Sequence, residues 1–500
     1  MTTRSTDSRV CIVGTARRTW HEPGTAAPEP LTMWEEVARA AFDDVGTRAD
    51  VAAELDHLGV VHCQSWIYDD PVARLGMRLG RNDLRGEVSI LAGTSPQRLL
   101  DAAASAMVRG EYSSALVVGC EAQATLRLFA QQGESPQWSF PDPRPVGVED
   151  MLSEWYLPTE FRHGVLPAWL TFALLGQARW AARGARPEDR AAMFTRLVRI
   201  SEVAADSPYA WFPLAHSAER LASTADGNRM VATPFTKLTT AFPSVDMAAA
   251  NLLVTEEVAD RWGVPADRRV YLRGWGFARD ASHIAARTDL ASSPAMRTAV
   301  GEAVAMAGVD REEIDVFDLY SCFGTAIDFA CDAIGIDIDD PRPLSMTGGL
   351  PFHGGPGSNY MNHSISAVVE HLRSRPGSTA LVTGVGMHMT KHVAAVWSTE
   401  RGDNAPSDRF DSQQTVLEDS EGPKVLDSFD GTVRVEAASA IHDRSGEATS
   451  MVAICSTADG SRLYARSDDA EVIAAVIDGS WVGAPAVVTG DGAGVNHLRL

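Results

Sequence analysis

The chain has 500 residues, of which 45% are apolar and 22% are charged, and its net charge is −22. This length predicts two or three domains, and the composition is that of an ordinary globular protein. The negative charge argues against electrostatic binding to nucleic acid. No apolar stretch is long enough to span a membrane, and no signal segment precedes the first strand-like run, so we expect a cytoplasmic protein without membrane insertion.

Six cysteines are scattered along the chain, and none belongs to a Cys-x-x-Cys pair. This spacing indicates neither a metal site nor a disulfide framework, so we expect small buried side chains. The chain has three lysines, Lys237, Lys391 and Lys424, which are the only candidates for lysine-based chemistry.

The first predicted strand covers residues 9–15. A glycine-rich turn at Gly93 then precedes a predicted helix over 97–108, in which apolar side chains recur at helical spacing. The continuous apolar run at 115–119 indicates a strand buried on both faces.

Residues 122–241 have a different character. They are rich in tryptophan and proline, contain predicted helices over 166–183 and 187–206, and show no clear buried strand. We expect a helical insertion that covers the first half of the chain.

The following residues repeat the order of the first half. Predicted strands at 270–277 and 314–319 precede a second glycine-rich turn at Gly354, an apolar helix, and a buried strand at 379–384. Such an internal duplication predicts two similar α/β halves.

The composition changes after Thr399. Residues 400–425 are polar and charged and predict a linker. Short alternating segments then follow without a long helix, which predicts a small closed antiparallel β-barrel over 426–500, with an oligonucleotide-binding (OB-like) barrel as one option. The predicted boundaries are therefore 1–270 for the N-terminal half with its insertion, 271–399 for the C-terminal half, 400–425 for the linker and 426–500 for the barrel.

Four segments resemble motifs of one known family, in the family's order. The segment 243–260, PSVDMAAANLLVTEEVAD, resembles an alanine-rich helix and the strand after it, and 345–360, SMTGGLPFHGGPGSNY, is similar to a loop that normally contains Gly-His-Pro. The segment 381–388, LVTGVGMH, resembles a loop that normally reads Cys-x-Gly, and 318–323, DLYSCF, stands where sterol-carrier-type members have His-Asp-Cys-Phe.

Over roughly residues 8–399 the chain therefore resembles the thiolase superfamily. With the barrel, it is most similar to the actinobacterial thiolase-like proteins of type 1, which are often labelled acetyl-CoA acetyltransferases. The resemblance implies a duplicated thiolase fold, with two βαβαβαββ halves in five α/β/α/β/α layers. The helices that begin near Gln97 and Met361 should then lie side by side between the sheets.

Three positions that carry thiolase chemistry depart from the family pattern. A thiolase nucleophile is a cysteine at the start of a buried helix, where the helix dipole lowers the thiol pKa. Ala92 stands nearest to that place, and residues 64–119 contain no cysteine. Gly355 and Thr383 replace the family's histidine and second cysteine. The resemblance therefore implies no ordinary thiolysis, although glycine turns can still form an oxyanion hole.

Nearby polar side chains are candidates to replace the missing groups. Tyr320 occupies the family's histidine position and could donate a proton or bind an oxyanion, or it could be a core tyrosine with a satisfied hydroxyl. His353 could supply an imidazole or bond to backbone. Asn359 could act in the site or cap the next helix, and His363 could point into the site or lie on the helix surface.

The candidate catalytic residues are thus Tyr320, His353, His363 and Asn359. The candidate substrate-binding residues are Gly93, Thr94, Cys322, Gly355, Gly384 and Gly386. Cys322 could equally be a packing residue. Lys391 could hold a CoA phosphate, form a Schiff base, or simply be solvated.

Three functions remain open. The resemblance implies an acyltransferase-family protein that acts on or binds acyl-CoA thioesters, with the CoA thioester as substrate or ligand and no bound cofactor. A retro-aldol lyase on β-hydroxyacyl-CoA would need a base and enolate stabilisation but no acyl-enzyme. A non-catalytic acyl-CoA-binding or scaffold protein would use the barrel for interactions. The resemblance also implies a role in lipid metabolism and a monomer or homodimer of the thiolase type.

Overall fold

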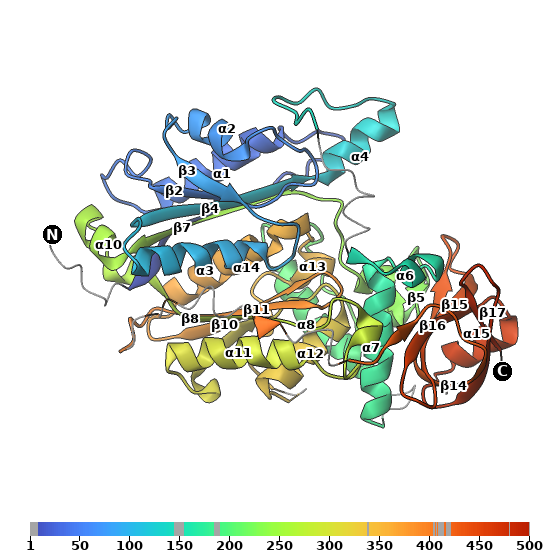
Figure 1. Cartoon of the computed structure of the whole chain (residues 1–500). Coiled ribbons are helices and arrows are strands. Elements are labelled where there is room, and N and C mark those ends of the chain that lie inside the picture. The colour runs from blue at the N-terminus through green and yellow to red at the C-terminus, as the bar shows by residue number, and fades with distance from the viewer. Residues whose placement is uncertain are drawn as a thin grey trace.

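The computed structural model describes residues 9–144, 155–184, 191–337, 340–403, 406, 408, 415–416, 422–479 and 481–499. The described strands form two sheets, one of ten strands and one of eight. The larger sheet runs through both α/β halves, and the smaller sheet contains the C-terminal barrel, which lies beside the α/β body (Figure 1). No described helix is long and apolar enough to cross a membrane.

The first half of the larger sheet has the strand order β3-β2-β4-β7-β1. Its central strands β4 and β7 are buried along their whole length and pair antiparallel. Helices α1 and α2 cover its outer face (Figure 1). The bounds are β1 Val10–Thr19, α1 Pro30–Asp44, β2 His57–Val60, α2 Pro71–Arg78, β3 Arg85–Val88, β4 Ser114–Ala122 and β7 Asp246–Thr255.

The second half continues in the order β8-β11-β10-β9, and the pair β1–β8 joins the two halves. Helices α11 and α12 cover the outer side of this half, while α3 and α14 lie side by side between the two halves (Figure 1). The layers are therefore helix, sheet, helix, sheet, helix, which confirms the predicted five-layer α/β fold. The bounds are α3 Ser95–Val108, β8 Val270–Arg279, α11 Pro294–Ala307, β9 Val316–Asp318, α12 Gly324–Ile334, α14 Tyr360–Arg373, β10 Thr379–Gly386 and β11 Lys391–Ser398.

The segment 243–260 folds in the opposite order to the predicted helix and strand. Residues 246–255 form β7, and the helix α10, Glu256–Trp262, follows it. The alanine run 248–250 favours helix by intrinsic propensity, but pairing with β1 and β4 buries every residue of the segment. Thr255 then caps α10 by accepting a hydrogen bond from the backbone N–H of Val258.

The insertion consists mainly of helices, as predicted, but it also contributes two short strands. Strands β5, Met230–Ala232, and β6, Phe235–Thr236, pair with each other, and β5 pairs with the first barrel strand. Strands of two or three residues are too short to show a period of two, so no sequence pattern indicated them. The described helices of the insertion are α4 Gln123–Gln132, α6 Pro158–Arg162, α7 Ala168–Ala182, α8 Ala191–Ala205 and α9 Ala218–Ala222.

The C-terminal strands close into a five-stranded barrel, β14-β15-β16-β18-β17, with β17 returning to β14. This confirms the predicted small closed barrel. Its strand pairs are antiparallel except β16 and β18, which pair in parallel, and a helix, α15, follows β16. The OB-like type stays a prediction. The bounds are β14 Gly431–His442, β15 Ala448–Ser456, β16 Arg462–Ser467, α15 Ala470–Ile477, β17 Pro485–Gly490 and β18 Asn496–Arg499.

The outer face of the barrel is packed against the rest of the protein. Ala437, Val452, Ile454 and Tyr464 belong to the main hydrophobic core, and α7 lies across β14. The inner face forms a separate core that includes Val435, Cys455 and Leu463.

The predicted domain boundaries stay predictions, and residues 404–405, 407, 409–414 and 417–421 of the predicted linker lie outside the described residues. Within the linker, β12, Thr415–Val416, pairs with β8.

Candidate functional site

Two turns and the end of a strand meet beside the N-terminus of α3. Residues 92–94 form the turn into α3, and Tyr320 follows β9. A Cβ atom added to Gly93 would lie 2.4 Å from the hydroxyl oxygen of Tyr320 and 2.3 Å from the backbone carbonyl oxygen of Val385. Real Cβ atoms do not make such contacts, so only glycine lets the turn approach the phenol this closely.

The turn at Gly386 lies against the same segment. A Cβ atom added to Gly386 would lie 3.2 Å from the Cβ of Ala92 and 3.4 Å from Oγ1 of Thr94. The structure thus brings four of the predicted residues, Gly93, Thr94, Tyr320 and Gly386, to one place.

Tyr320 is a buried phenol that stays protonated. Burial raises the pKa of Tyr320 well above its usual value. Its backbone N–H donates to Oγ1 of Thr383 at 3.0 Å, so the threonine that replaces the family's second cysteine fixes the backbone of Tyr320. The rings of Tyr320 and Tyr360 meet edge to face with centroids 5.5 Å apart.

A buried carboxylate holds the loop around this tyrosine pair. Asp318 accepts hydrogen bonds from the backbone N–H groups of Met346 at 2.6 Å and Thr347 at 3.2 Å, and from the hydroxyl of Ser364 on α14. Burial raises the pKa of Asp318, although these hydrogen bonds oppose the increase. The Tyr360 hydroxyl in turn bonds to Thr347 at 2.6 Å. Asp318 therefore positions the start of α14 against β9.

Both candidate histidines are buried next to Tyr360. Nε2 of His353 lies 3.3 Å from Nδ1 of His363, and the rings of His353 and Tyr360 have centroids 6.1 Å apart. Burial lowers the pKa of His353 to about 3, and burial with the neighbouring His353 holds the pKa of His363 well below its usual value. In each neutral imidazole one ring nitrogen donates a hydrogen bond and the other accepts one. With pKa values this low, both rings are weak bases.

Asn359 does not cap α14. Its Nδ2 donates to the backbone carbonyl of Gly119 at 2.8 Å, and its Oδ1 accepts from Nδ2 of Asn362 at 2.8 Å. A Cβ atom at Gly119 would lie 2.2 Å from Oδ1 of Asn359, so glycine is required there. The carboxamide holds α14 against β4, and its catalytic role stays a prediction.

Three other predicted residues lie around the site but contact different parts of the fold. The backbone N–H of Gly355 donates to the carbonyl of Phe242 at 2.9 Å. Gly384 lets β10 approach α14, since a Cβ atom there would lie 2.1 Å from the sulfur of Met361. Cys322 is buried, and burial raises the pKa of its thiol well above its usual value.

Comparison with solved structures bears directly on this arrangement. No family model and no curated protein matches the chain. The structure is similar to a monomeric SCP2-thiolase-like protein type 1 from Mycobacterium smegmatis, with a TM-score of 0.83 and 29% identity over 98% of this chain and 99% of that one. The chain is a thiolase-like protein. An acetyl-CoA acetyltransferase from Syntrophomonas wolfei has the same fold, with a TM-score of 0.56 and 15% identity over 79% of this chain and 100% of that one.

The thiolase-like core also contains a histidine that the sequence analysis passed over. His388 lies between Met387 and Met389, which have positive φ angles of 55° and 59°. Its Nδ1 lies 2.9 Å from Oγ1 of Thr171, and its Nε2 bonds to the hydroxyl of Tyr156. Burial lowers the pKa of His388 to about 4. His388 ends the predicted 381–388 motif, which was the signal that could have identified it.

A buried glutamate joins this region of the thiolase-like body to the barrel. Glu160 accepts a hydrogen bond from the hydroxyl of the barrel residue Tyr464 at 2.8 Å, and it lies 3.0 Å from Nδ1 of His283. The sequence offered no signal for Glu160 or Tyr156, because their partners come from segments far away in the chain.

Proposed function

We propose that this thiolase-like protein binds acyl-CoA thioesters at the turn around Gly93 and acts on them without a cysteine nucleophile. The observation that carries the proposal is the contact between Gly93 and the Tyr320 hydroxyl. The names of the two similar structures, an SCP2-thiolase-like protein and an acetyl-CoA acetyltransferase, support a CoA thioester as the ligand.

The residues at the start of α3 support a site without a thiolate. By the family resemblance Ala92 stands nearest to the nucleophile's place, and all six cysteines of the chain are buried. Cys322, which lies two residues from Tyr320, has a thiol whose pKa burial raises, so it is a poor source of thiolate near neutral pH. Transfer through an acyl-cysteine is therefore not part of the proposal.

The chemistry that the site supports is stabilisation of negative charge on the thioester oxygen. Tyr320 is desolvated and stays protonated, so its hydroxyl can donate a hydrogen bond to an enolate or to a tetrahedral oxyanion. Gly93 and Gly386 let their turns pack closely against Tyr320 and Thr94, so the backbone of both turns lies near the phenol that would bind the thioester oxygen.

A retro-aldol lyase on β-hydroxyacyl-CoA is the second candidate. The observation that favours it is the cluster of neutral donors, Tyr320, Tyr360, His353 and His363, in a site without a thiolate. In this reaction the bond between the α- and β-carbons breaks, its electron pair forms the enolate, and the β-hydroxyl proton passes to the neutral imidazole of His353 or His363. A neutral donor beside the thioester oxygen would stabilise that enolate.

Calorimetry with acetyl-CoA tests the proposal directly. Wild-type protein should bind, and Gly386→Val should not, because a Cβ atom at this position would already lie 3.2 Å from the Cβ of Ala92 and 3.4 Å from Oγ1 of Thr94, so the valine methyl groups would push the turn out of place. Gly301→Val is the matched control, since a Cβ atom at Gly301 meets nothing within 4 Å. Acetoacetyl-CoA with CoA should give no thiolysis. No binding of acetyl-CoA or of a longer acyl-CoA would refute the proposal, and binding without turnover would leave the non-catalytic function.

A further inference from the structure

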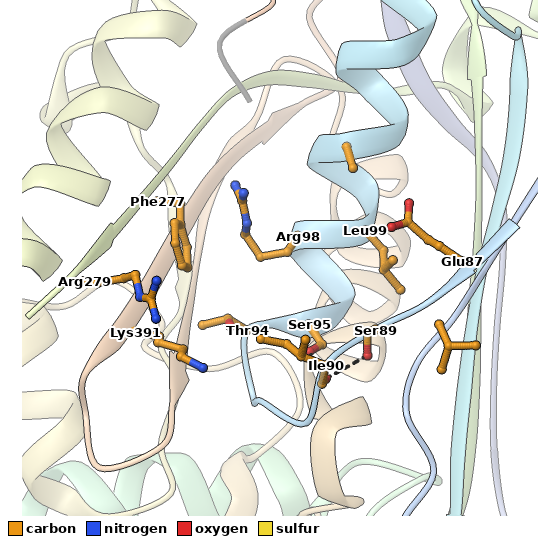
Figure 2. A pocket seen from close by; sticks show the side chains of 12 residues that line it. Glu87, Ser89, Ile90, Thr94, Ser95, Arg98, Leu99, Phe277, Arg279 and Lys391 are labelled. Atoms are coloured by element: carbon orange, nitrogen blue, oxygen red, sulfur yellow. Dashed lines mark hydrogen bonds between the residues drawn. The ribbon is translucent and has the colours of Figure 1, made fainter. Parts of the chain in front are cut away.

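A cavity of about 300 Å³ opens between β3, α3, β8 and β11 (Figure 2). Lys391, Arg279 and Phe277 line one side, Arg98 of α3 points toward Phe277, and Leu99 lies on the other side of α3 toward Glu87. The cavity borders the candidate site without being part of it. Thr94 lines the cavity, and a Cβ atom added to Gly386 would lie 3.3 Å from the Cβ of Lys391.

The cavity gathers positive charge in a protein whose net charge is −22. Arg98 lies over the ring of Phe277, with its guanidinium carbon 4.3 Å from the ring centroid, and 3.8 Å from the carboxylate of Asp101. Neither Arg279 nor Lys391 has a carboxylate within ion-pair distance among the described residues. Burial and the charge of Arg279 lower the pKa of Lys391, as expected for a cation beside another cation.

One carboxylate, that of Glu87 on β3, also lines the cavity. Glu87 lies 3.6 Å from Nε2 of His57 and half of its side chain is exposed. Arg279 and Lys391 repel each other, and no carboxylate pairs with either among the described residues. Water or a ligand of opposite charge must therefore compensate their charges.

The rest of the lining combines apolar side chains with the hydroxyl-bearing residues Ser89, Thr94 and Ser95. The apolar lining residues are Leu99, Ala102, Phe277, Val88 and Ile90, of which Val88 and Ile90 have 42% and 65% of their surface exposed. The cavity volume is at the lower end of the range for small-molecule sites. It therefore fits a phosphate or diphosphate together with part of the organic group that the phosphate esterifies. A pair of cations such as Arg279 and Lys391 suits phosphate, because the two side chains together donate several hydrogen bonds to a doubly charged group.

We propose that this cavity is a binding site for a phosphate ester with an apolar part, of the nucleotide type, held by Arg279 and Lys391 with Arg98 above. This site stands independently of the proposed function. Its ligand is either a free nucleotide or the nucleotide portion of CoA, and both present the same phosphate chemistry.

Calorimetry on the full chain with ADP and with inorganic pyrophosphate tests the site. Arg279→Ala and Lys391→Ala should each weaken ADP binding about 10- to 100-fold, the loss expected for one hydrogen bond to a charged group. Lys391→Arg should keep most of the affinity, and binding should weaken as salt is raised. Arg127→Ala on the exposed side of α4 removes the same charge away from the cavity and should change nothing.

Two further measurements identify the source of the phosphate. If acetyl-CoA competes with ADP while acetyl-pantetheine does not, the site holds the nucleotide portion of CoA. If ADP binds without competition, or if acetyl-CoA does not bind at all, the site holds a separate nucleotide. Either result supports the cavity, and the absence of acetyl-CoA binding counts only against the proposed function.

The proposal fails if neither ADP nor pyrophosphate binds, or if binding is the same in Arg279→Ala, Lys391→Ala and wild type. It also fails if light scattering shows a dimer that Val88→Asp and Ile90→Asp dissociate, because the cavity would then be covered by a second copy. The thermal unfolding of each variant should match that of Arg127→Ala, which separates loss of the site from loss of the fold.

Discussion

His353 and His363 form a hydrogen-bonded imidazole pair, with Nε2 of the first 3.3 Å from Nδ1 of the second and neither ring exposed to solvent. The pair lies beside Tyr360, which itself packs against Tyr320. The interior of this thiolase-like protein therefore contains polar rings that burial keeps in their neutral forms.

The first prediction concerns the pH dependence of stability. In the folded protein the pKa of His353 is lowered to about 3 and that of His363 is also lowered, whereas in the unfolded chain both are near 6.5. The unfolded state therefore gains protons first as the pH falls, and stability that is present above pH 6.5 is lost towards acid pH. Each histidine should contribute a slope of about 1.4 kcal/mol per pH unit below 6.5.

Urea unfolding at pH 7.5, 6.5, 5.5 and 4.5 measures this effect. The double variant His353→Gln, His363→Gln should lose stability less steeply than wild type below pH 6.5, since all other titrating groups are shared. Parallel profiles for the two proteins would show that the histidines are not held neutral.

The second prediction concerns the contact between Gly93 and Tyr320. Gly93→Ala should lower the free energy of unfolding by about 1–3 kcal/mol, because the added carbon overlaps a backbone carbonyl that cannot move away alone. Gly301→Ala, in the exposed part of α11 where nothing lies within 4 Å, should instead stabilise the protein by about 0.5–1 kcal/mol. Equal effects of the two substitutions in thermal unfolding would contradict the close approach.

The third prediction separates binding from catalysis. Tyr320→Phe removes the hydroxyl and keeps the ring, so acyl-CoA binding by calorimetry should be largely unchanged. If Tyr320 is the donor to the thioester oxygen, turnover of a β-hydroxyacyl-CoA should fall by about 10²–10⁴-fold, in kcat rather than in KM. Unchanged turnover would show that Tyr320 has no role in catalysis and only packs in the core.

The fourth prediction concerns the attachment of the barrel. Tyr464 donates to Glu160 at 2.8 Å and accepts from the backbone N–H of Ala285 at 3.2 Å. Tyr464→Phe leaves the Glu160 carboxylate and the Ala285 N–H without this partner. It should lower the free energy of unfolding, measured in urea, by about 1–3 kcal/mol. Tyr209→Phe keeps its ring stacked on Arg17 and should change stability by less than about 0.5 kcal/mol. A Tyr464→Phe protein as stable as the control would mean that this link adds nothing.

Much of the fold could be predicted because its strands are continuous apolar runs. The runs at 115–119 and 379–384 correspond to β4 and β10, and the short alternating segments after residue 431 correspond to the barrel strands. The predictions were wrong where tertiary pairing overrode local preference. The alanine-rich β7 is a strand because β1 and β4 flank it.

The site was predictable to the extent that glycines and strand ends converge. Gly93, Tyr320 and Gly386, each named as a candidate site residue from the sequence, lie together in the structure. The partner of Asn359 was not predictable, because the carbonyl of Gly119 comes from another strand. The same holds for His388, whose partners Tyr156 and Thr171 belong to the insertion.

A crystal structure of the protein with a non-reactive acyl-CoA analogue would test the central claim most directly. The quantity to measure is the distance from the thioester carbonyl oxygen, or the atom that replaces it, to the hydroxyl oxygen of Tyr320. We predict a hydrogen bond of about 2.6–3.2 Å, with the acyl group beside Gly93. A carbonyl carbon lying against the sulfur of Cys322, or an analogue bound away from Gly93 and Tyr320, would contradict the claim.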